Sequence, residues 1–180
     1  MKYIKLFENF EDYDPYELML VSPNDKTEMI FKEIEKKDKA NLNLVSDLIA
    51  LGANLDWQGD EGWTVIHECA YHNHPEILKM LIGAGADLNI QRDDGWTALL
   101  LSAYRNHSEI AKILIGAEAD LNMQENNYGF TPLHVCANWN HPEILRMLID
   151  AGADKTIQNN AGELPYELAD TQELKKLLKP

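Results

Sequence analysis

The apolar residues of this chain recur in a pattern that is helical over short distances and periodic over long ones. Four of them stand at positions i, i+1, i+4 and i+5, which places their side chains along one face of an α-helix: Ile77, Leu78, Leu81 and Ile82. The last pair returns at intervals of 33, 33 and 34 residues, as Leu48-Ile49, Leu81-Ile82, Leu114-Ile115 and Leu148-Ile149. This pattern predicts a series of similar helices, one in each unit of about 33 residues.

Two further series share the same period. One comprises Gly62-Trp63-Thr64, Gly95-Trp96-Thr97 and Gly129-Phe130-Thr131, and the other comprises Gly52-Ala53-Asn54, Gly85-Ala86-Asp87, Glu118-Ala119-Asp120 and Gly152-Ala153-Asp154. Threonine is a favourable residue at a helix N-cap, and glycine suits the left-handed backbone that follows a helix. Each unit is therefore predicted to contain two short antiparallel helices and a projecting turn. Such a unit cannot bury its own apolar face and has to stack on its neighbours.

The residues at the start of each unit resemble the ankyrin repeat family. Thr131-Pro132-Leu133-His134 matches the family's Thr-Pro-Leu-His signature, and Thr64-Val65-Ile66-His67 is a near match. The resemblance covers roughly residues 26–180. It implies an all-α solenoid of helix-turn-helix units with projecting, β-hairpin-like turns.

The period divides the chain into an N-terminal extension and a repeat domain. The extension covers residues 1–24, and the repeat domain covers residues 25–180 in about five units. The expected units are 25–57, which caps the N-terminus, then 58–91, 92–124 and 125–158, and finally 159–180, which caps the C-terminus.

Three departures from the repeat carry structural expectations. Thr97-Ala98-Leu99-Leu100 lacks the histidine of the signature, so the third unit should lose a side-chain hydrogen bond. Glu118 stands where the other units have glycine, and a left-handed backbone there costs on the order of 1 kcal/mol. One extra residue near Asn126-Asn127-Tyr128 should lengthen the fourth turn.

The N-terminal part of the chain is less regular. The first unit has a charged first helix that includes Lys32-Glu33-Ile34-Glu35-Lys36-Lys37, which we interpret as a cap facing water. Within the extension, an amphipathic helical pattern is formed by Tyr3, Leu6, Phe7, Phe10 and Tyr13. This helix either packs over the first repeat or docks into a groove of a partner.

Composition excludes two classes of partner. The chain has 16 Lys+Arg against 30 Asp+Glu and a formal net charge of −14, whereas nucleic acids and anionic membranes require a basic surface. The longest apolar run, at residues 80–86, is far shorter than the roughly 20 residues of a membrane-spanning helix. We also find no signal-peptide pattern, so we expect a cytoplasmic protein.

The residue types that carry chemistry follow the repeat. His74, His107 and His141 are equivalent, as are His67 and His134, and units stack about 8–10 Å apart, which is too far for shared metal ligands. Cys69 and Cys136 are likewise equivalent and are expected to be buried thiols. Because no carboxylate pair or phosphate-binding loop breaks the repeat, we expect no catalytic activity, no metal and no cofactor.

The resemblance implies a binding face, because ankyrin repeats use the projecting turn and the exposed end of the first helix to line a concave surface. The positions concerned are Asp60, Glu61, Trp63, Tyr71, His72, Asp93, Asp94, Trp96, Tyr104, Arg105, Asn127, Tyr128, Phe130, Asn138 and Trp139. Seven of these fifteen are aromatic, against 8% of the whole chain. Large rigid rings dominate interface hot spots, although Trp63 and Trp96 have the alternative of packing on neighbouring turns.

These observations predict a monomeric, non-catalytic module that binds a protein or peptide through an acidic, aromatic concave face. Carboxylates pair with Lys or Arg and rings offer cation–π contacts, so the partner is expected to be basic or mixed in character. The alternative is an inhibitor or effector that blocks a target enzyme or defence factor by the same surface. The opening residues, Met1-Lys2-Tyr3-Ile4, resemble the short leaders of some phage-encoded proteins.

Overall fold

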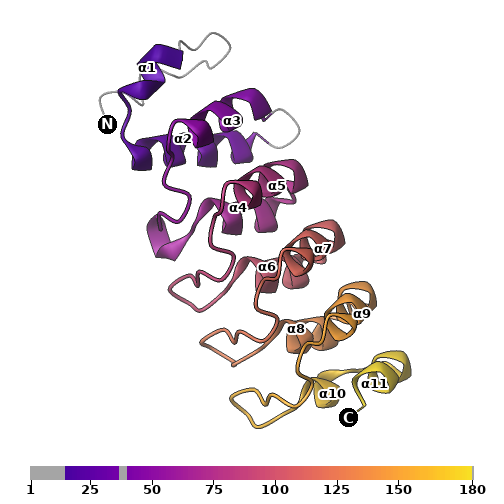
Figure 1. Ribbon diagram of the computed structural model, residues 1–180. Coiled ribbons are helices and arrows are strands. Elements are labelled where there is room, and N and C mark those ends of the chain that lie inside the picture. The colour runs from indigo at the N-terminus through magenta and orange to yellow at the C-terminus, as the bar shows by residue number, and fades with distance from the viewer. Residues whose placement is uncertain (1–14, 37–39, 180) are drawn as a thin grey trace.

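A computed structural model describes residues 15–36 and 40–179 of the chain. These residues form pairs of antiparallel helices and contain no strand (Figure 1). The first helices of the pairs, here called the inner helices, are α2 (Pro23–Glu35), α4 (Val65–His72), α6 (Ala98–Arg105), α8 (Pro132–Asn138) and α10 (Pro165–Leu168). The second, or outer, helices are α3 (Leu42–Ala50), α5 (Pro75–Gly83), α7 (Ser108–Gly116), α9 (Pro142–Asp150) and α11 (Gln172–Leu178). A short helix α1 (Pro15–Met19) precedes them, and a 3₁₀ turn η4 (Asp60–Gly62) precedes α4.

The helices begin and end where the sequence places their signals. Thr97 caps α6 by accepting a hydrogen bond from the backbone of Leu100 at 3.2 Å. Asn73 and Asn106 adopt left-handed backbone angles directly after α4 and α6, with φ of 62° and 57°. Asn140 has the same conformation after α8, so in the second, third and fourth units the chain reverses at an asparagine and starts the outer helix.

The helix pairs stack along one direction, as the prediction of an all-α ankyrin solenoid requires, and that prediction is confirmed. Each inner helix packs on the next inner helix, and each outer helix packs on the next outer helix. The core is a continuous apolar layer between the two rows rather than one central cluster. Its fully buried residues include Leu48, Leu81, Leu114 and Leu148, which are the leucines of the sequence ladder.

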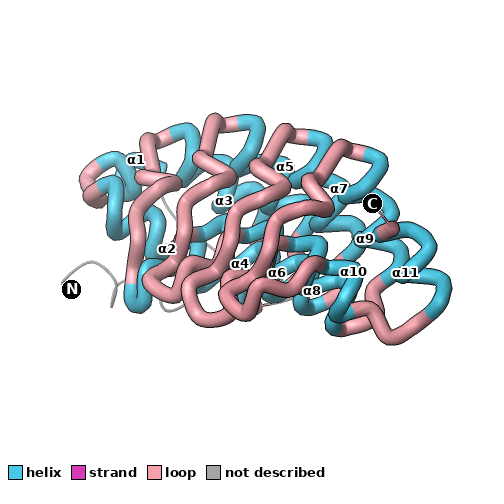
Figure 2. The backbone as a smooth tube through the Cα atoms, turned by 90° about the horizontal axis from the view of Figure 1, so that it is seen from below, coloured by secondary structure: helices cyan, strands magenta, loops and turns pink. Residues whose placement is uncertain are grey.

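The projecting turns lie side by side along the stack (Figure 2). A ladder of glutamines joins them, because the amide of Gln58 donates to the carbonyl of Gln91 at 3.0 Å and that of Gln91 donates to Gln124 at 3.1 Å. Within each turn, a backbone hydrogen bond such as Arg92 N–H to Trp96 O at 3.0 Å gives the hairpin-like closure. The turns are therefore held as one sheet-like surface without strands in the described residues.

The signature histidines join one unit to the next. His67 Nδ1 accepts from the Thr64 backbone at 3.1 Å, and His67 Nε2 lies 3.1 Å from the carbonyl of Trp96 in the following unit. His134 repeats the arrangement with Thr131 and Glu163. In the third unit a buried Leu100 takes this place, so that unit makes neither histidine contact.

The other departures also have structural counterparts. Glu118 has a φ of 63°, the left-handed conformation that glycine adopts at the equivalent Gly85 with φ of 86°. The fourth turn is one residue longer than its neighbour, since Gly129 N–H donates to Glu125 O whereas Gly95 N–H donates to Arg92 O.

The first unit differs from expectation in one respect. The sequence predicts that its first helix faces water along its charged stretch, which is wrong for Glu33, since this residue is fully buried. The Glu33 carboxylate accepts from the backbone of Asn41 at 2.7 Å and pairs with Lys36, so it holds the start of α3. Helix α2 begins at Pro23, after Ser22 as N-cap.

The N-terminal extension is described only from residue 15 onward. Leu18 and Val21 are buried and belong to the core, so this part packs on the first repeat. The amphipathic pattern of residues 3–13, for which packing and docking were both open, lies outside the described residues.

Candidate functional site

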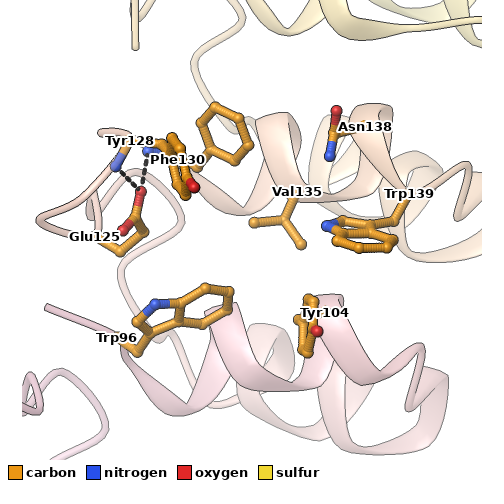
Figure 3. A pocket seen from close by; sticks show the side chains of 8 residues that line it. All are labelled: Trp96, Tyr104, Glu125, Tyr128, Phe130, Val135, Asn138 and Trp139. Atoms are coloured by element: carbon orange, nitrogen blue, oxygen red, sulfur yellow. Dashed lines mark hydrogen bonds between the residues drawn. The ribbon is translucent and has the colours of Figure 1, made fainter. Parts of the chain in front are cut away.

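A pocket rich in aromatic side chains lies on the side of the turns, between the third and fourth units (Figure 3). It has a volume of about 480 Å³, which is within the range of ligand-binding pockets. The third unit contributes Trp96 and Tyr104 to its wall. The fourth contributes Glu125, Tyr128, Phe130, Val135, Asn138 and Trp139.

The rings of this pocket contact one another in series. Trp96 and Tyr104 meet edge to face with centroids 5.5 Å apart, and Tyr104 meets Trp139 in the same way at 5.3 Å. Three of the rings remain largely open to solvent, with exposed fractions of 67% for Tyr128, 51% for Trp139 and 40% for Tyr104. Exposed aromatic area gathered around one hollow is typical of an interaction surface.

Glu125 forms the base of the longer fourth turn. It is only 2% exposed, and its carboxylate accepts hydrogen bonds from three backbone N–H groups. The donors are Asn127 at 2.8 Å, Tyr128 at 2.7 Å and Phe130 at 3.0 Å. In the shorter fifth turn, Asn159 Oδ1 accepts two such bonds, from Ala161 and Glu163, both at 2.9 Å. Glutamate, with a longer side chain, thus fits the turn that is one residue longer, and it fixes the backbone that presents Tyr128 and Phe130.

A second pocket, of about 390 Å³, lies between the first and second units. Helix α2 lines it with Glu28, Phe31, Lys32 and Glu35, and the segment that leads from the first unit into α4 lines it with Trp57, Gly59, Asp60, Trp63 and Glu68. We call it the acidic pocket, and the pocket between the third and fourth units the aromatic pocket.

The interface between the second and third units is covered instead by two arginines. The guanidinium of Arg92 lies 3.9 Å from the centroid of a Trp63 ring, and that of Arg105 lies 4.4 Å from the centroid of Tyr71. Arg92 also pairs with Asp94 at 2.8 Å. In the aromatic pocket, one unit later, the positions of these arginines are taken by Glu125, which bonds to its own turn, and by Trp139.

The structure divides the predicted binding residues into groups. Six line the aromatic pocket: Trp96, Tyr104, Tyr128, Phe130, Asn138 and Trp139. Asp60 and Trp63 line the acidic pocket. Tyr71 and Arg105 contact each other, His72 pairs with Glu68 at 3.2 Å, and Asp94 is held by Arg92.

The remaining three predicted residues lie in the turn ladder. The backbone N–H of Asp93 donates to the carbonyl of Glu61 at 3.1 Å. The carbonyl of Asn127 accepts from the side chain of Asn160 at 3.1 Å. The half-buried Trp63 and Trp96 pack against the core and also line pockets, so the two roles considered for them coexist.

Several lining residues were not among those predicted. Glu125 and Val135 belong to the aromatic pocket, and the residues of α2 together with Trp57 and Glu68 belong to the acidic one. A signal for Glu125 was present, since it stands one position before the inserted residue. The α2 residues gave no signal, because the first unit does not follow the repeat.

Reactive side chains are tied to structural roles. Cys69 and Cys136 are buried free thiols, and burial raises the pKa of both well above the ordinary value. Burial, with the nearby Arg92, lowers the pKa of His67 to about 4.

Residues 15–36 and 40–179 contain no group of three or more potential metal ligands. In the same ranges, no helix has the length and apolar character needed to cross a membrane.

Comparison with known proteins agrees with this geometry. No curated protein matches the chain. A family profile described as ankyrin repeats, in three copies, matches residues 35–124 and 66–159. Repeats of this kind generally serve as protein–protein interaction modules and are typically non-catalytic. Because the two matches together extend from residue 35 to residue 159 of 180, the chain belongs to the ankyrin repeat family.

Proposed function

We propose that this protein binds a segment of a partner protein by taking an apolar side chain of that segment into the aromatic pocket. The observation that carries the proposal is the cluster of three exposed rings, Tyr104, Tyr128 and Trp139, around one cavity of about 480 Å³. Burying such rings releases them from water at a small cost in side-chain entropy.

The pocket is suited to an uncharged group. Its one carboxylate, that of Glu125, already accepts three backbone hydrogen bonds and lies buried in the turn. The rest of the wall consists of rings, the Val135 side chain and the Asn138 amide. An aliphatic or aromatic side chain would fill the cavity, while Asn138 offers a donor and an acceptor to the partner's backbone.

The charge of the whole chain favours a partner of the opposite sign. At a net charge of −14, the field around the protein attracts basic segments and repels acidic ones. The preferred ligand is therefore a segment that combines an apolar anchor with flanking Lys or Arg.

The test is selection of peptides from a random library displayed on phage, with Trp139→Arg as the comparison variant. Arginine already occupies the equivalent position at Arg105, so the variant should fold while losing the aromatic wall. Peptides enriched on the unmodified protein should fail to bind Trp139→Arg and should still bind Tyr166→Ala, which removes a 36% exposed ring outside both pockets. Equal binding to Trp139→Arg would overturn the proposal.

A further inference from the structure

The acidic pocket combines two kinds of wall. Phe31 and Trp57 meet edge to face with centroids 6.1 Å apart, and Trp63 adds a third aromatic side chain. Four carboxylates share the cavity with them, those of Glu28, Glu35, Asp60 and Glu68, against a single cation, Lys32. Rings beside uncompensated carboxylates are the surroundings that favour an organic cation.

The negative charge of this pocket is not neutralised from within. In the described part of the chain, no ion pair joins Lys32 to any of the four carboxylates, and only Glu68 has a partner, His72 at 3.2 Å. Burial and then the carboxylate of Glu35 raise the pKa of Glu68, more than the positive charge of Arg92 lowers it, so the charges of Glu35 and Glu68 repel each other. A cation placed between them would relieve this repulsion.

The neighbouring interface indicates which cation fits. There the chain covers its own rings with guanidinium groups, Arg92 over Trp63 and Arg105 over Tyr71, and pairs one of them with Asp94. The acidic pocket shares Trp63 with that interface and offers the same combination of rings and carboxylates, but no arginine is among the residues that line it. Its volume of about 390 Å³ leaves room for a long basic side chain.

We infer that the acidic pocket binds an arginine or lysine side chain of the partner protein. The alkyl part of that side chain would pack on Phe31 and Trp57, and its charged end would lie among Glu28, Glu35 and Glu68. The inference rests on the proposed function in that the basic side chain belongs to the segment bound by the aromatic pocket.

The test uses the indole N–H signals of the protein in two-dimensional NMR. The four tryptophans divide evenly, since Trp57 and Trp63 line the acidic pocket while Trp96 and Trp139 line the aromatic one. The probe is Nα-acetyl-arginine methylamide, and its neutral control is the corresponding citrulline compound. The arginine probe should shift the signals of Trp57 and Trp63 at concentrations where citrulline does not, and should leave Trp96 and Trp139 in place.

Two charge variants in the acidic pocket should change the affinity for the arginine probe in opposite directions. Glu35→Gln should weaken binding of the arginine probe about two- to fivefold, which is the contribution of a partly exposed ion pair. Lys32→Gln should strengthen it by removing the competing cation. Glu143→Gln, on the outer helix α9, is the matched control for net charge and should change nothing beyond a small general effect.

Three results would overturn the inference: no shift of Trp57 and Trp63, equal shifts with citrulline, or equal weakening by Glu35→Gln and Glu143→Gln. Failure here is separable from failure of the proposed function. The probe experiment reports on Trp57 and Trp63, whereas the peptide selection depends on Trp139 in the other pocket.

Discussion

The rings of Tyr104 and Trp139 meet edge to face, with their centroids 5.3 Å apart. One unit earlier, Tyr71 is covered by Arg105 at 4.4 Å, so the fourth unit replaces a cation by an aromatic ring at the same position. Tyr104 and Tyr71 are equivalent, and both contact the tryptophan of their own turn, Trp96 and Trp63. The exchange of arginine for tryptophan therefore separates an interface closed by the chain itself from one that presents apolar rings.

This relationship predicts that Trp139→Arg retains the fold. The new guanidinium can lie over Tyr104 as Arg105 lies over Tyr71, so the free energy of unfolding should fall by about 1 kcal/mol or less. Urea denaturation followed by circular dichroism measures this. A loss above about 3 kcal/mol would mean that Trp139 is a structural residue rather than a binding residue.

Glu125→Gln should destabilise the fourth turn. One carboxylate oxygen of Glu125 accepts hydrogen bonds from two backbone N–H groups and the other oxygen accepts one. In glutamine one of these oxygens is replaced by an NH₂ group, which would face backbone N–H donors without an acceptor. The expected loss is about 2–3 kcal/mol in the free energy of unfolding, measured in urea. Glu109→Gln, at an exposed outer-helix position, is the control and should change stability by less than about 0.5 kcal/mol. Similar small losses for both variants would contradict the structural role of Glu125.

Glu118→Gly should stabilise the protein. The φ of 63° at Glu118 is strained for a residue with a Cβ atom, whereas Gly85 and Gly152 adopt this region without that cost. After allowance for the greater freedom of glycine in the unfolded chain, a gain of about 0.5–1 kcal/mol is expected. The midpoint of urea unfolding should rise, and a fall in the midpoint would contradict this explanation.

Stability should decrease as the pH falls from above 6.5 toward 4. The pKa of His67 is lowered from 6.5 to about 4, so in this window the unfolded chain binds a proton that the native chain does not. His134 adds to the effect, because burial lowers its pKa as well. Protonation would place a hydrogen on His67 Nδ1, which now accepts from the Thr64 backbone.

The expected loss from His67 alone is about 3 kcal/mol across this window, measurable by urea unfolding at several pH values. His67→Leu, which copies the residue at Leu100, should be less stable at pH 7 and should show a shallower dependence on pH. An unchanged slope in the variant would show that other groups cause the acid sensitivity.

The fold was predictable because the residues that determine it are repeated. The ladder leucines are buried in four units, an asparagine follows the inner helix with left-handed angles in three, and the signature histidine makes the same contacts in two, so one period was enough to infer the stack. Glu118 and the inserted residue were also recognisable, because a departure is visible wherever a repeat is regular. The burial of Glu33 could not be predicted, because it depends on the contact with the start of α3, which no repeated position indicates.

The candidate site was predictable only in part. The aromatic residues of the turn and inner helix could be selected by their position in the repeat, and five of them, with Asn138, line one pocket. The role of the arginines was not foreseen, because whether Arg92 faces solvent or covers Trp63 depends on contacts between units. The acidic pocket was missed for a related reason, since helix α2 departs from the repeat and contributes its residues through packing.

The most direct test of the central claim is a titration of a selected peptide monitored by the indole signals of the protein. If the aromatic pocket is the binding site, the signals of Trp96 and Trp139 should shift, and the dissociation constant should rise at least about tenfold in Trp139→Arg while staying unchanged in Tyr166→Ala. A peptide that binds with unperturbed Trp96 and Trp139 signals, and with equal affinity for Trp139→Arg, would contradict the account.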